Sequence, residues 1–390
     1  MSIDVICKTD VVNFDNIGKH KQNSNMKTMN TFRMTVVFAL LWCAGLQNAK
    51  AGNLLSKEDS LELVKMCQDY EAAKKKAYDR MNTQEALLDF SDSHYDKKKE
   101  EIEKHYEEEL ESLKNDFGAS LAANPRFVKV TRLRNILMNY LDKRNADRRA
   151  REKTEKWQRG EYIDPETGIM MDEKVIFVAE WDGKLIKLIK DNPAFMDYPG
   201  YLFKEIDEDI HVATSADGRL RYYSWHTSHF GTGPNVIAIR HYRTANGKVL
   251  LTWEDGNDPF DSEYQDLVNK IHTLDANGKR IYLLEEYNTQ GAAWGIYRYH
   301  AEVIEKNVIT HPTVFDTNDD EGDLVLNFNR ADWEFRYGYG EKGDWVVKYD
   351  EPTRTIFVRK YEDEENNILS EDYITYTFDG EKFVRSCRED

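Results

Sequence analysis

Five Asn-Gly or Asp-Gly dipeptides constrain the fold of the C-terminal part of the chain more than any other feature. Each separates two short runs of alternating apolar and polar residues. This is the strongest short-range signal for a β-hairpin, because the tight turn needs positive φ at both central residues. The dipeptides occupy residues 182–183, 217–218, 246–247, 277–278 and 379–380. We therefore predict that residues 161–390 form an antiparallel all-β domain, arranged as a sandwich of packed sheets or as an irregular propeller-like fold.

Residues 52–160 have the pattern of helices instead. Ser56 is a favourable N-cap for the run that follows it, in which acidic residues occupy the first turn. A second run has apolar residues at helical spacing. We predict that this helix ends between Gly118 and Pro125. Its apolar residues are Ile102, Tyr106, Leu110, Leu113 and Phe117. We expect a helical hairpin or short coiled coil ahead of the β domain, so the predicted fold class is α+β.

Residues 1–51 have the pattern of an N-terminal extension followed by a secretory signal peptide. An uncharged apolar core at 34–46 follows two basic residues, and small residues stand at Ala49 and Ala51. The core is too short to span a bilayer comfortably, and we expect no transmembrane segment after cleavage. The chain is predicted to be cleaved after Ala51 and to reach an extracytoplasmic compartment, the periplasm or the cell exterior.

The two cysteines that remain after cleavage are compatible with an oxidising extracytoplasmic compartment. Cys7 and Cys43 would leave with the leader, so that Cys67 and Cys387 remain of the four cysteines in the chain. In an oxidising compartment these two are candidates for one disulfide that joins the first helix to the end of the chain. Two separate thiols are the alternative.

The charge of the chain bears on its partners. The formal net charge is −17, which makes nucleic acid an unfavourable partner, because neutralising phosphate charge dominates that affinity. Residues 124–160 are the exception, with twelve Lys and Arg against four Asp and Glu. This basic segment is a candidate contact for an envelope protein or glycan; the alternative is a solvated face or packing on acidic parts of the same chain. The candidate residues are Lys143, Arg144, Arg148, Arg149 and Arg151.

The stretch RLRYYSWHTSHFGTGPNV at 219–236 combines residue types found in reaction centres. We predict a strand over 219–225, with alternate side chains on opposite faces, and a loop over 226–234. A serine nucleophile with a histidine base would be one use of these residues, and zinc ligation by the histidines another. No G-x-S-x-G or H-E-x-x-H motif accompanies them, so we interpret the segment as a structural Gly-rich loop. The candidate residues are Ser224, His226, His229 and His241.

A second cluster, DTNDDEGDL at 316–324, collects carboxylates as calcium loops do. An EF-hand loop needs glycine at its sixth position, and here Gly322 is the seventh residue. The segment is therefore a candidate for calcium binding of another kind, or a solvated acidic turn. Its candidate ligands are Asp316, Asn318, Asp320 and Asp323. We predict no other metal or cofactor.

Three strings within residues 210–304 form a recognisable series: DGRLRYYSWHTSHFGTG, NVIAIRHYR and RIYLLEEYNTQGAAWGIYRYHAEVI. This series resembles a group of secreted Bacteroidetes β-rich proteins of unknown function. Those proteins carry two glycines before the threonine of the loop, whereas this chain keeps only Gly231 before Thr232. The resemblance implies an exported β-rich protein and brings no catalytic residues.

Two hypotheses for the function follow. In the first, the chain is an exported, non-catalytic binding or scaffold protein, with a helical arm for interaction and a β domain for binding. The alternative is an extracytoplasmic hydrolase that acts on a polysaccharide or another envelope polymer. Glycoside hydrolysis would need a pair of carboxylates in a cleft, and the sequence indicates no such pair.

Overall fold

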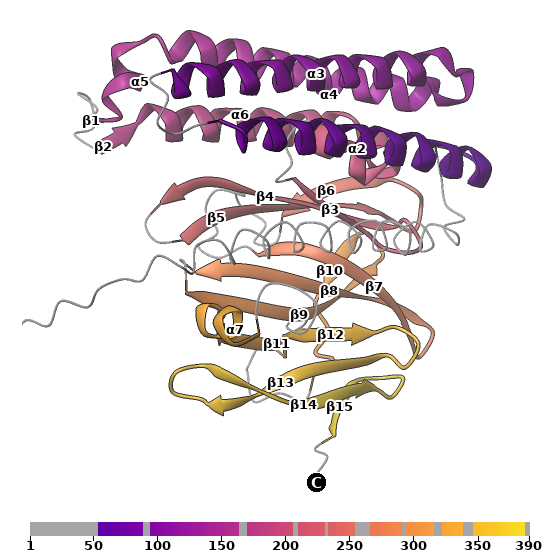
Figure 1. Cartoon of the computed structure of the whole chain (residues 1–390). Helices are drawn as coiled ribbons and strands as arrows, with labels where there is room; N and C mark the ends of the chain where they lie inside the picture. Colours follow the sequence, from indigo (N-terminus) through magenta and orange to yellow (C-terminus); the bar gives the residue numbers. More distant parts are fainter. Residues whose placement is uncertain are drawn as a thin grey trace, which may run out of the picture.

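The computed structural model shows a helical layer above three stacked antiparallel sheets (Figure 1). It describes residues 54–88, 94–163, 170–205, 210–230, 233–253, 266–290, 293–315, 322–337 and 346–386. The predicted leader, residues 1–51, lies outside these ranges. Within them, none of the helices combines the length and the apolar character that a membrane crossing requires. The predicted fold class, helices followed by an antiparallel β part, is confirmed.

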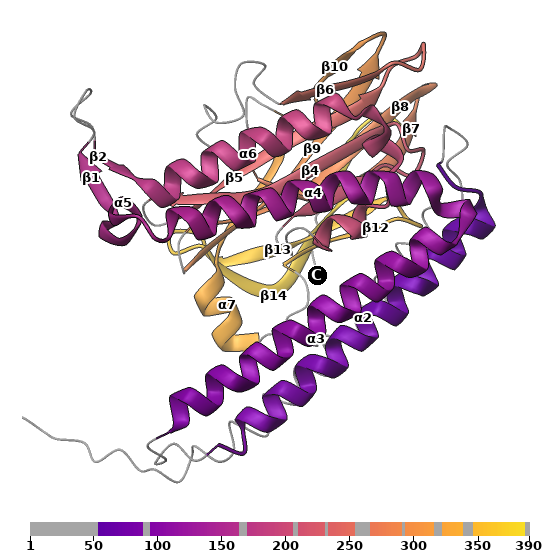
Figure 2. The ribbon, with the colours of Figure 1, turned by 90° about the horizontal axis from the view of Figure 1, so that it is seen from above.

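Five helices make up the helical layer. They are α2 (Lys57–Glu85), α3 (Tyr95–Ala123), α4 (Val128–Arg151), α5 (Glu155–Arg159) and α6 (Glu173–Asp191). Two short 3-10 helices, η4 (Pro193–Asp197) and η5 (Gly200–Glu205), follow α6. Seen from above, α4 and α6 run across the first sheet, while α2 and α3 diverge from them as an antiparallel pair, which we call the arm (Figure 2).

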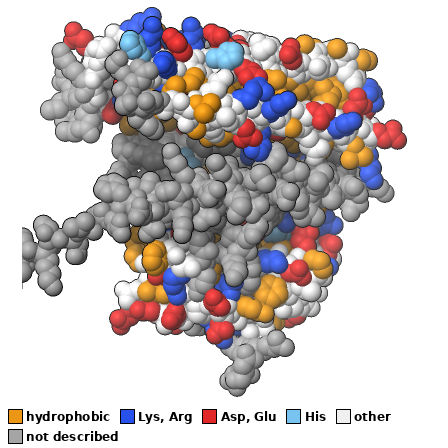
Figure 3. Space-filling model, viewed as in Figure 1, with side chains coloured by type: hydrophobic (Ala, Val, Ile, Leu, Met, Phe, Trp, Pro, Cys, Tyr) orange, Lys and Arg blue, Asp and Glu red, His pale blue; other side chains and the backbone are white. Residues whose placement is uncertain are grey.

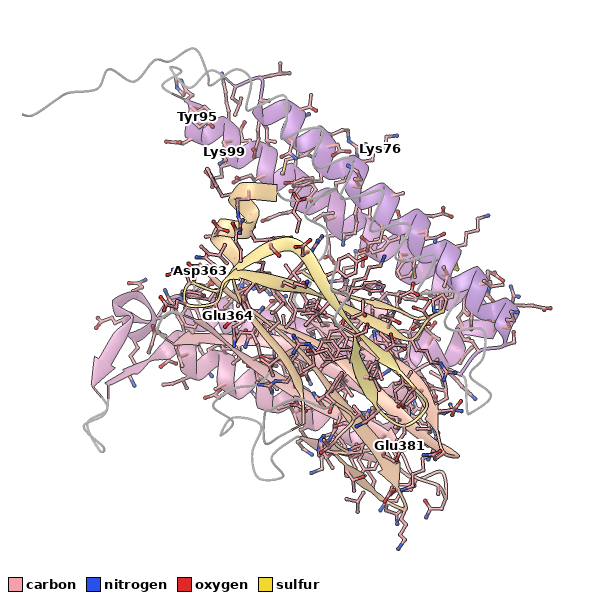
Figure 4. All side chains as sticks on the ribbon, turned by 90° about the horizontal axis from the view of Figure 1, so that it is seen from below. Lys76, Tyr95, Lys99, Asp363, Glu364 and Glu381 are labelled. Carbon is pink, nitrogen blue, oxygen red and sulfur yellow. The ribbon has the colours of Figure 1, made fainter. Side chains whose placement is uncertain are left out.

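The arm is the predicted helical hairpin. Ser56 caps α2 as expected, since its Oγ accepts a hydrogen bond from the Asp59 amide at 3.1 Å. Near the base of the arm, the rings of Tyr70 and Phe117 stack with centroids 4.8 Å apart. Farther out, Ala77 is buried and the rings of Tyr78 and Tyr106 are in contact, while other residues are half-buried or form surface ion pairs. Lys76, Tyr95 and Lys99 lie on this outer part, which reaches beyond the sheets (Figure 4).

Helix α3 ends within the predicted segment between Gly118 and Pro125, and Gly118 itself lies inside the helix. Helix α3 continues to Ala123 and stops only before Pro125. The glycine has a packing role, because a Cβ at this position would overlap the guanidinium of Arg134 from α4. Arg134 in turn forms a buried ion pair with Glu205 at 2.7 Å. The missing side chain thus lets α3 and α4 approach each other around a buried charge.

The predicted hairpin at Asp182–Gly183 is wrong, because residues 173–191 form helix α6. The short runs alternate well enough to suggest strands, but over the whole segment apolar residues recur every four positions. Phe177, Trp181, Leu185 and Ile189 are buried on one face as a result. Gly183 has no positive φ, so it does not serve as a turn residue.

The sheets have simple meander topologies. The first sheet has the order β3-β4-β5-β6, the second β10-β9-β8-β7 with β11 also paired to β9, and the third β12-β13-β14-β15. The strands of the first sheet are β3 (His211–Thr214), β4 (Leu220–Phe230), β5 (Gly233–Arg243) and β6 (Val249–Trp253). Those of the second are β7 (Leu267–Ala276), β8 (Lys279–Gln290), β9 (Trp294–Glu305), β10 (Val308–Thr310) and β11 (Leu324–Asn329). Those of the third are β12 (Val347–Asp350), β13 (Thr355–Asp363), β14 (Ile368–Phe378) and β15 (Phe383–Ser386).

Smaller elements complete the chain. Strands β1 (Glu161–Ile163) and β2 (Met170–Asp172) pair with each other beside the helices, and α7 (Arg330–Tyr337) follows β11. The other four predicted hairpin turns are confirmed, since they join β3 to β4, β5 to β6, β7 to β8 and β14 to β15. The sheets stack as layers, so of the two predicted arrangements the structure has packed sheets, three instead of two (Figure 1).

Each interface between layers holds a hydrophobic core. The first core joins the helical layer to the first sheet, the next joins the first and second sheets, and the last joins the second and third. Strand β4 shows the predicted alternation: Tyr223 and Trp225 enter the first core, while Leu220 and Tyr222 enter the next. The first core therefore contains residues from both sides of the predicted division at residue 160.

The loop predicted over 226–234 is mostly strand. Strand β4 continues to Phe230 and β5 begins at Gly233, with a register shift between His226 and His229. A β-bulge lets a strand absorb an irregular segment without ending. His226, His229 and Gly233 thus belong to the two strands of a long hairpin.

Replacing Gly183 with alanine tests helix α6. An added Cβ there meets nothing within 4 Å, so Gly183→Ala should raise the free energy of unfolding by about 0.5–1 kcal/mol through helix propensity. Gly278 is the matched control: its added Cβ also meets nothing within 4 Å, but its φ is +77°. Gly278→Ala should therefore lower the free energy of unfolding, by about 1–2 kcal/mol. Urea unfolding measures both, and an equal loss in the two variants would contradict the helix.

Candidate functional site

A pocket of about 550 Å³ opens between α4, α5 and α6. Two turns of α4, the short helix α5 and the first turns of α6 form its walls. Among the described residues that line it, three are cationic and none is acidic. The lining residues are Leu141, Arg144, Asn145, Arg148, Trp157, Lys174, Phe177 and Val178.

The positive wall of the pocket comes from two helices. Arg144 and Arg148 are four residues apart on α4, so they lie on the same face of that helix. Lys174 comes from the first turn of α6, whose N-cap Asp172 accepts a hydrogen bond from the Lys174 amide at 2.8 Å. The helix dipole adds partial positive charge at this N-terminus. Arg148 stays accessible, because its side chain is 56% exposed and its ion pair with Glu152, at 3.4 Å, lies on the surface.

The lining also includes two aromatic side chains, Trp157 and Phe177. Trp157 packs edge-on against Phe177 with ring centroids 5.6 Å apart. Helix α5 holds the indole in place, since the Thr154 hydroxyl accepts a hydrogen bond from the Trp157 amide at 3.3 Å. Phe177 belongs to the first core, whereas Trp157 is only half-buried. The pocket lining thus combines an aromatic pair with three cationic side chains.

The five basic residues predicted as a contact divide into three groups. Arg144 and Arg148 line the pocket together, whereas Lys143 and Arg149 are exposed on the same helix. Arg151 packs inward, over the ring of Phe177, and forms ion pairs with its own chain. Its carboxylate partners are Asp147 at 3.2 Å, Glu173 at 3.2 Å and Glu180 at 2.6 Å. Internal packing, the alternative that we considered, therefore describes Arg151.

Of the candidate residues Ser224, His226, His229 and His241, the structure places the described side chains of Ser224 and His241 on opposite faces of the first sheet. Ser224 is buried on the side of the second sheet, where its Oγ accepts a hydrogen bond from the Val268 amide at 3.1 Å. His241 lies on the other face of the first sheet, with Nδ1 3.3 Å from the Tyr223 hydroxyl. His226 is half-buried opposite Val236. His229 pairs with Pro234 in the ladder, and its side chain is outside what the structure describes.

Two further predictions stay open. Asp316, Asn318 and Asp320 of the calcium candidate lie outside the described residues, and Asp323 comes just before β11. Cys67 is buried on α2, while Cys387 also lies outside the described residues. The calcium site and the disulfide therefore remain predictions.

Of the lining residues, only Arg144 and Arg148 were predicted as contact residues; Trp157, Lys174 and Phe177 are among those that sequence reasoning missed. A signal was present for Phe177, because it begins the four-residue apolar repeat of α6. The prediction of a hairpin at Asp182–Gly183 overlooked this apolar repeat. On the face seen in Figure 3, acidic and basic side chains are interspersed over the helical layer, so a site whose charged described lining residues are all cationic differs from its surroundings.

Comparisons of the chain with known protein families, with curated proteins and with solved structures found no match. The resemblance to secreted Bacteroidetes proteins stays a prediction.

His241 should make the stability of the protein depend on pH. Burial, together with the nearby Arg221 and Arg243 guanidinium groups, lowers the pKa of His241 from about 6.5 to about 3. The folded state therefore favours neutral His241, and this contribution to stability is complete above pH 6.5 and is lost as the pH falls toward 3. The loss should reach at most about 1.4 kcal/mol per pH unit.

The variant His241→Gln should lose stability less steeply than the wild type between pH 6.5 and 4. Tyr223 keeps a partner in the variant, because its hydroxyl also donates to the Phe195 carbonyl at 3.0 Å. Urea unfolding at several pH values gives the two slopes. Parallel curves for the two proteins would show that His241 is not held neutral.

Proposed function

We propose that the chain is an exported, non-catalytic binding protein whose pocket between α4, α5 and α6 binds an acidic segment of an envelope glycan. The observation that carries the proposal is the lining of the pocket: it includes the cations Arg144, Arg148 and Lys174 and the indole of Trp157, with no acidic side chain among the described lining residues. The formal net charge of the chain is −17. The charged side chains that line this site therefore have the opposite sign to the net charge of the chain.

The residue types suit an acidic sugar. Guanidinium groups bind carboxylates and phosphates in a bidentate way, with strong charge-assisted hydrogen bonds. An indole offers a large apolar surface on which the C–H face of a sugar ring can pack. The volume of about 550 Å³ lies within the usual range of small-molecule sites, so the pocket would enclose a short segment of a polymer.

The hydrolase alternative receives no support from the described residues. Ser224 and His241, two of the candidate residues, lie on opposite faces of the first sheet. The arm, in this proposal, serves a second contact with the envelope, and its exposed outer part is consistent with that role.

Titration calorimetry with oligogalacturonate, a polymer of uronic acid, tests the pocket. The chain from residue 52 should bind this probe and not a neutral oligosaccharide of the same length. The double variant Arg144→Gln/Arg148→Gln should bind it at least tenfold more weakly, because each charge-assisted hydrogen bond contributes about 1.5–3 kcal/mol.

The matched control is Lys143→Gln/Arg149→Gln, which removes the same charge from the same helix outside the pocket. It should bind like the wild type. Equal weakening in both double variants would mean that the probe senses only the overall charge of α4, and absence of binding by the wild type would contradict the proposed ligand class.

A further inference from the structure

A second group of side chains lies between the first and second sheets, away from the pocket. His300 and Glu302 are two residues apart on β9, so both point to the same face of the second sheet. His311 follows β10, which pairs with β9. One ligand atom from each of His300, Glu302 and His311 lies within 4.8 Å of the other two.

Glu302 is the least expected member of this group. Its side chain is fully buried, at 0% exposure. Oε1 accepts hydrogen bonds from the Tyr222 hydroxyl, at 2.6 Å, and from the Arg240 guanidinium. Oε2 has no hydrogen-bond partner among the described residues. A buried carboxylate oxygen without a partner is costly, and a metal ion at this position would remove that cost.

His300 is held in an orientation that suits a ligand. It is buried, and its Nδ1 lies 3.3 Å from Oε2 of Glu286, which is also buried. If Nδ1–H donates to this carboxylate, the lone pair is on Nε2. Carboxylates commonly orient metal-binding histidines in this way and raise the basicity of the ligating nitrogen.

His311 lies on the solvent side of the group. Its side chain is exposed, and its ring centroid is 6.0 Å from that of His300. In a tetrahedral zinc site, ligand atoms stand roughly 3.3 Å apart, since bonds to nitrogen and oxygen are about 2.0–2.1 Å. The three atoms, all within 4.8 Å of one another, are therefore at most about 1.5 Å farther apart than in a bound site.

We infer that His300, Glu302 and His311 form a binding site for one divalent transition metal ion, of which zinc fits best. Two imidazole nitrogens and one carboxylate oxygen are a ligand set that such ions prefer over calcium or magnesium. The formal charges of Glu302 and Glu286 exceed that of Arg240 by one negative charge, which favours a cation. Three protein ligands leave a fourth position for water or another small ligand.

Zinc titration of the metal-free full-length mature chain, followed by calorimetry, tests this site. The wild type should bind one Zn²⁺ per chain, and zinc should raise its unfolding temperature, because an ion that binds only the folded state stabilises it. His311→Ala should bind zinc at least tenfold more weakly. The exposed His311 makes this variant safe for folding, which circular dichroism checks.

His105→Ala is the matched control, because His105 is an exposed histidine on α3, far along the arm from the group. It should bind zinc like the wild type. Glu286→Gln should weaken binding about 10- to 100-fold, the effect usual for a carboxylate that orients a ligand. Absence of stoichiometric binding by the wild type, or undiminished binding by His311→Ala, would overturn the inference without affecting the glycan pocket.

Discussion

The burial of the first sheet on both faces is the constraint on which the rest of the structure depends. One face needs the second sheet, and the other needs a cover of helices. Helix α6 provides that cover with its four-residue apolar repeat. A polar contact fixes its position on β4, because the buried Asp182 carboxylate accepts hydrogen bonds from Trp225 Nε1 at 3.0 Å and Thr227 Oγ1 at 2.5 Å. Helix α4 then packs beside α6, and the pocket lies where the two helices meet α5.

Buried ion pairs accompany the apolar cores. Arg134 and Glu205 link α4 to η5, and burial raises the pKa of Glu205 although Arg134 opposes this shift. Arg240 of the first sheet binds Glu302 of the second. Breaking one partner of such a pair is far more costly than replacing both, because it leaves a buried charge alone. Loss of a single partner, such as Arg134 or Glu302, should therefore be more destabilising than apolar replacement of both partners of its pair.

A histidine bridge connects the second and third sheets in the same manner. His272 lies between two carboxylates, with Nε2 3.1 Å from Glu285 and Nδ1 3.0 Å from Glu351. The hydrogen bond from His272 lowers the pKa of Glu351 to about 2. Because the folded state lowers this pKa, the contribution to stability is complete above the ordinary value near 4.5 and is lost as the pH falls toward 2.

Local signals in the sequence predicted local structure well. The Ser56 cap, the apolar seam of α3 and four hairpin turns depend on neighbouring residues, and Asn277 and Gly278 indeed both have positive φ. Helix α6 was missed because short alternating runs and an Asp-Gly pair outweighed a repeat visible only over the whole segment. The pocket and the histidine–glutamate group could not be predicted, since each joins side chains from separate elements that only the fold brings together.

Fluorine NMR of the fluorotryptophan-labelled chain is the most direct test of the central claim, that the pocket between α4, α5 and α6 binds an acidic glycan. Trp157→Phe identifies the resonance of the pocket indole among the eight tryptophans of the chain. On addition of oligogalacturonate, the account predicts a saturable shift of the Trp157 resonance that is lost in Arg144→Gln/Arg148→Gln. A bound probe that leaves the Trp157 resonance unchanged would contradict it.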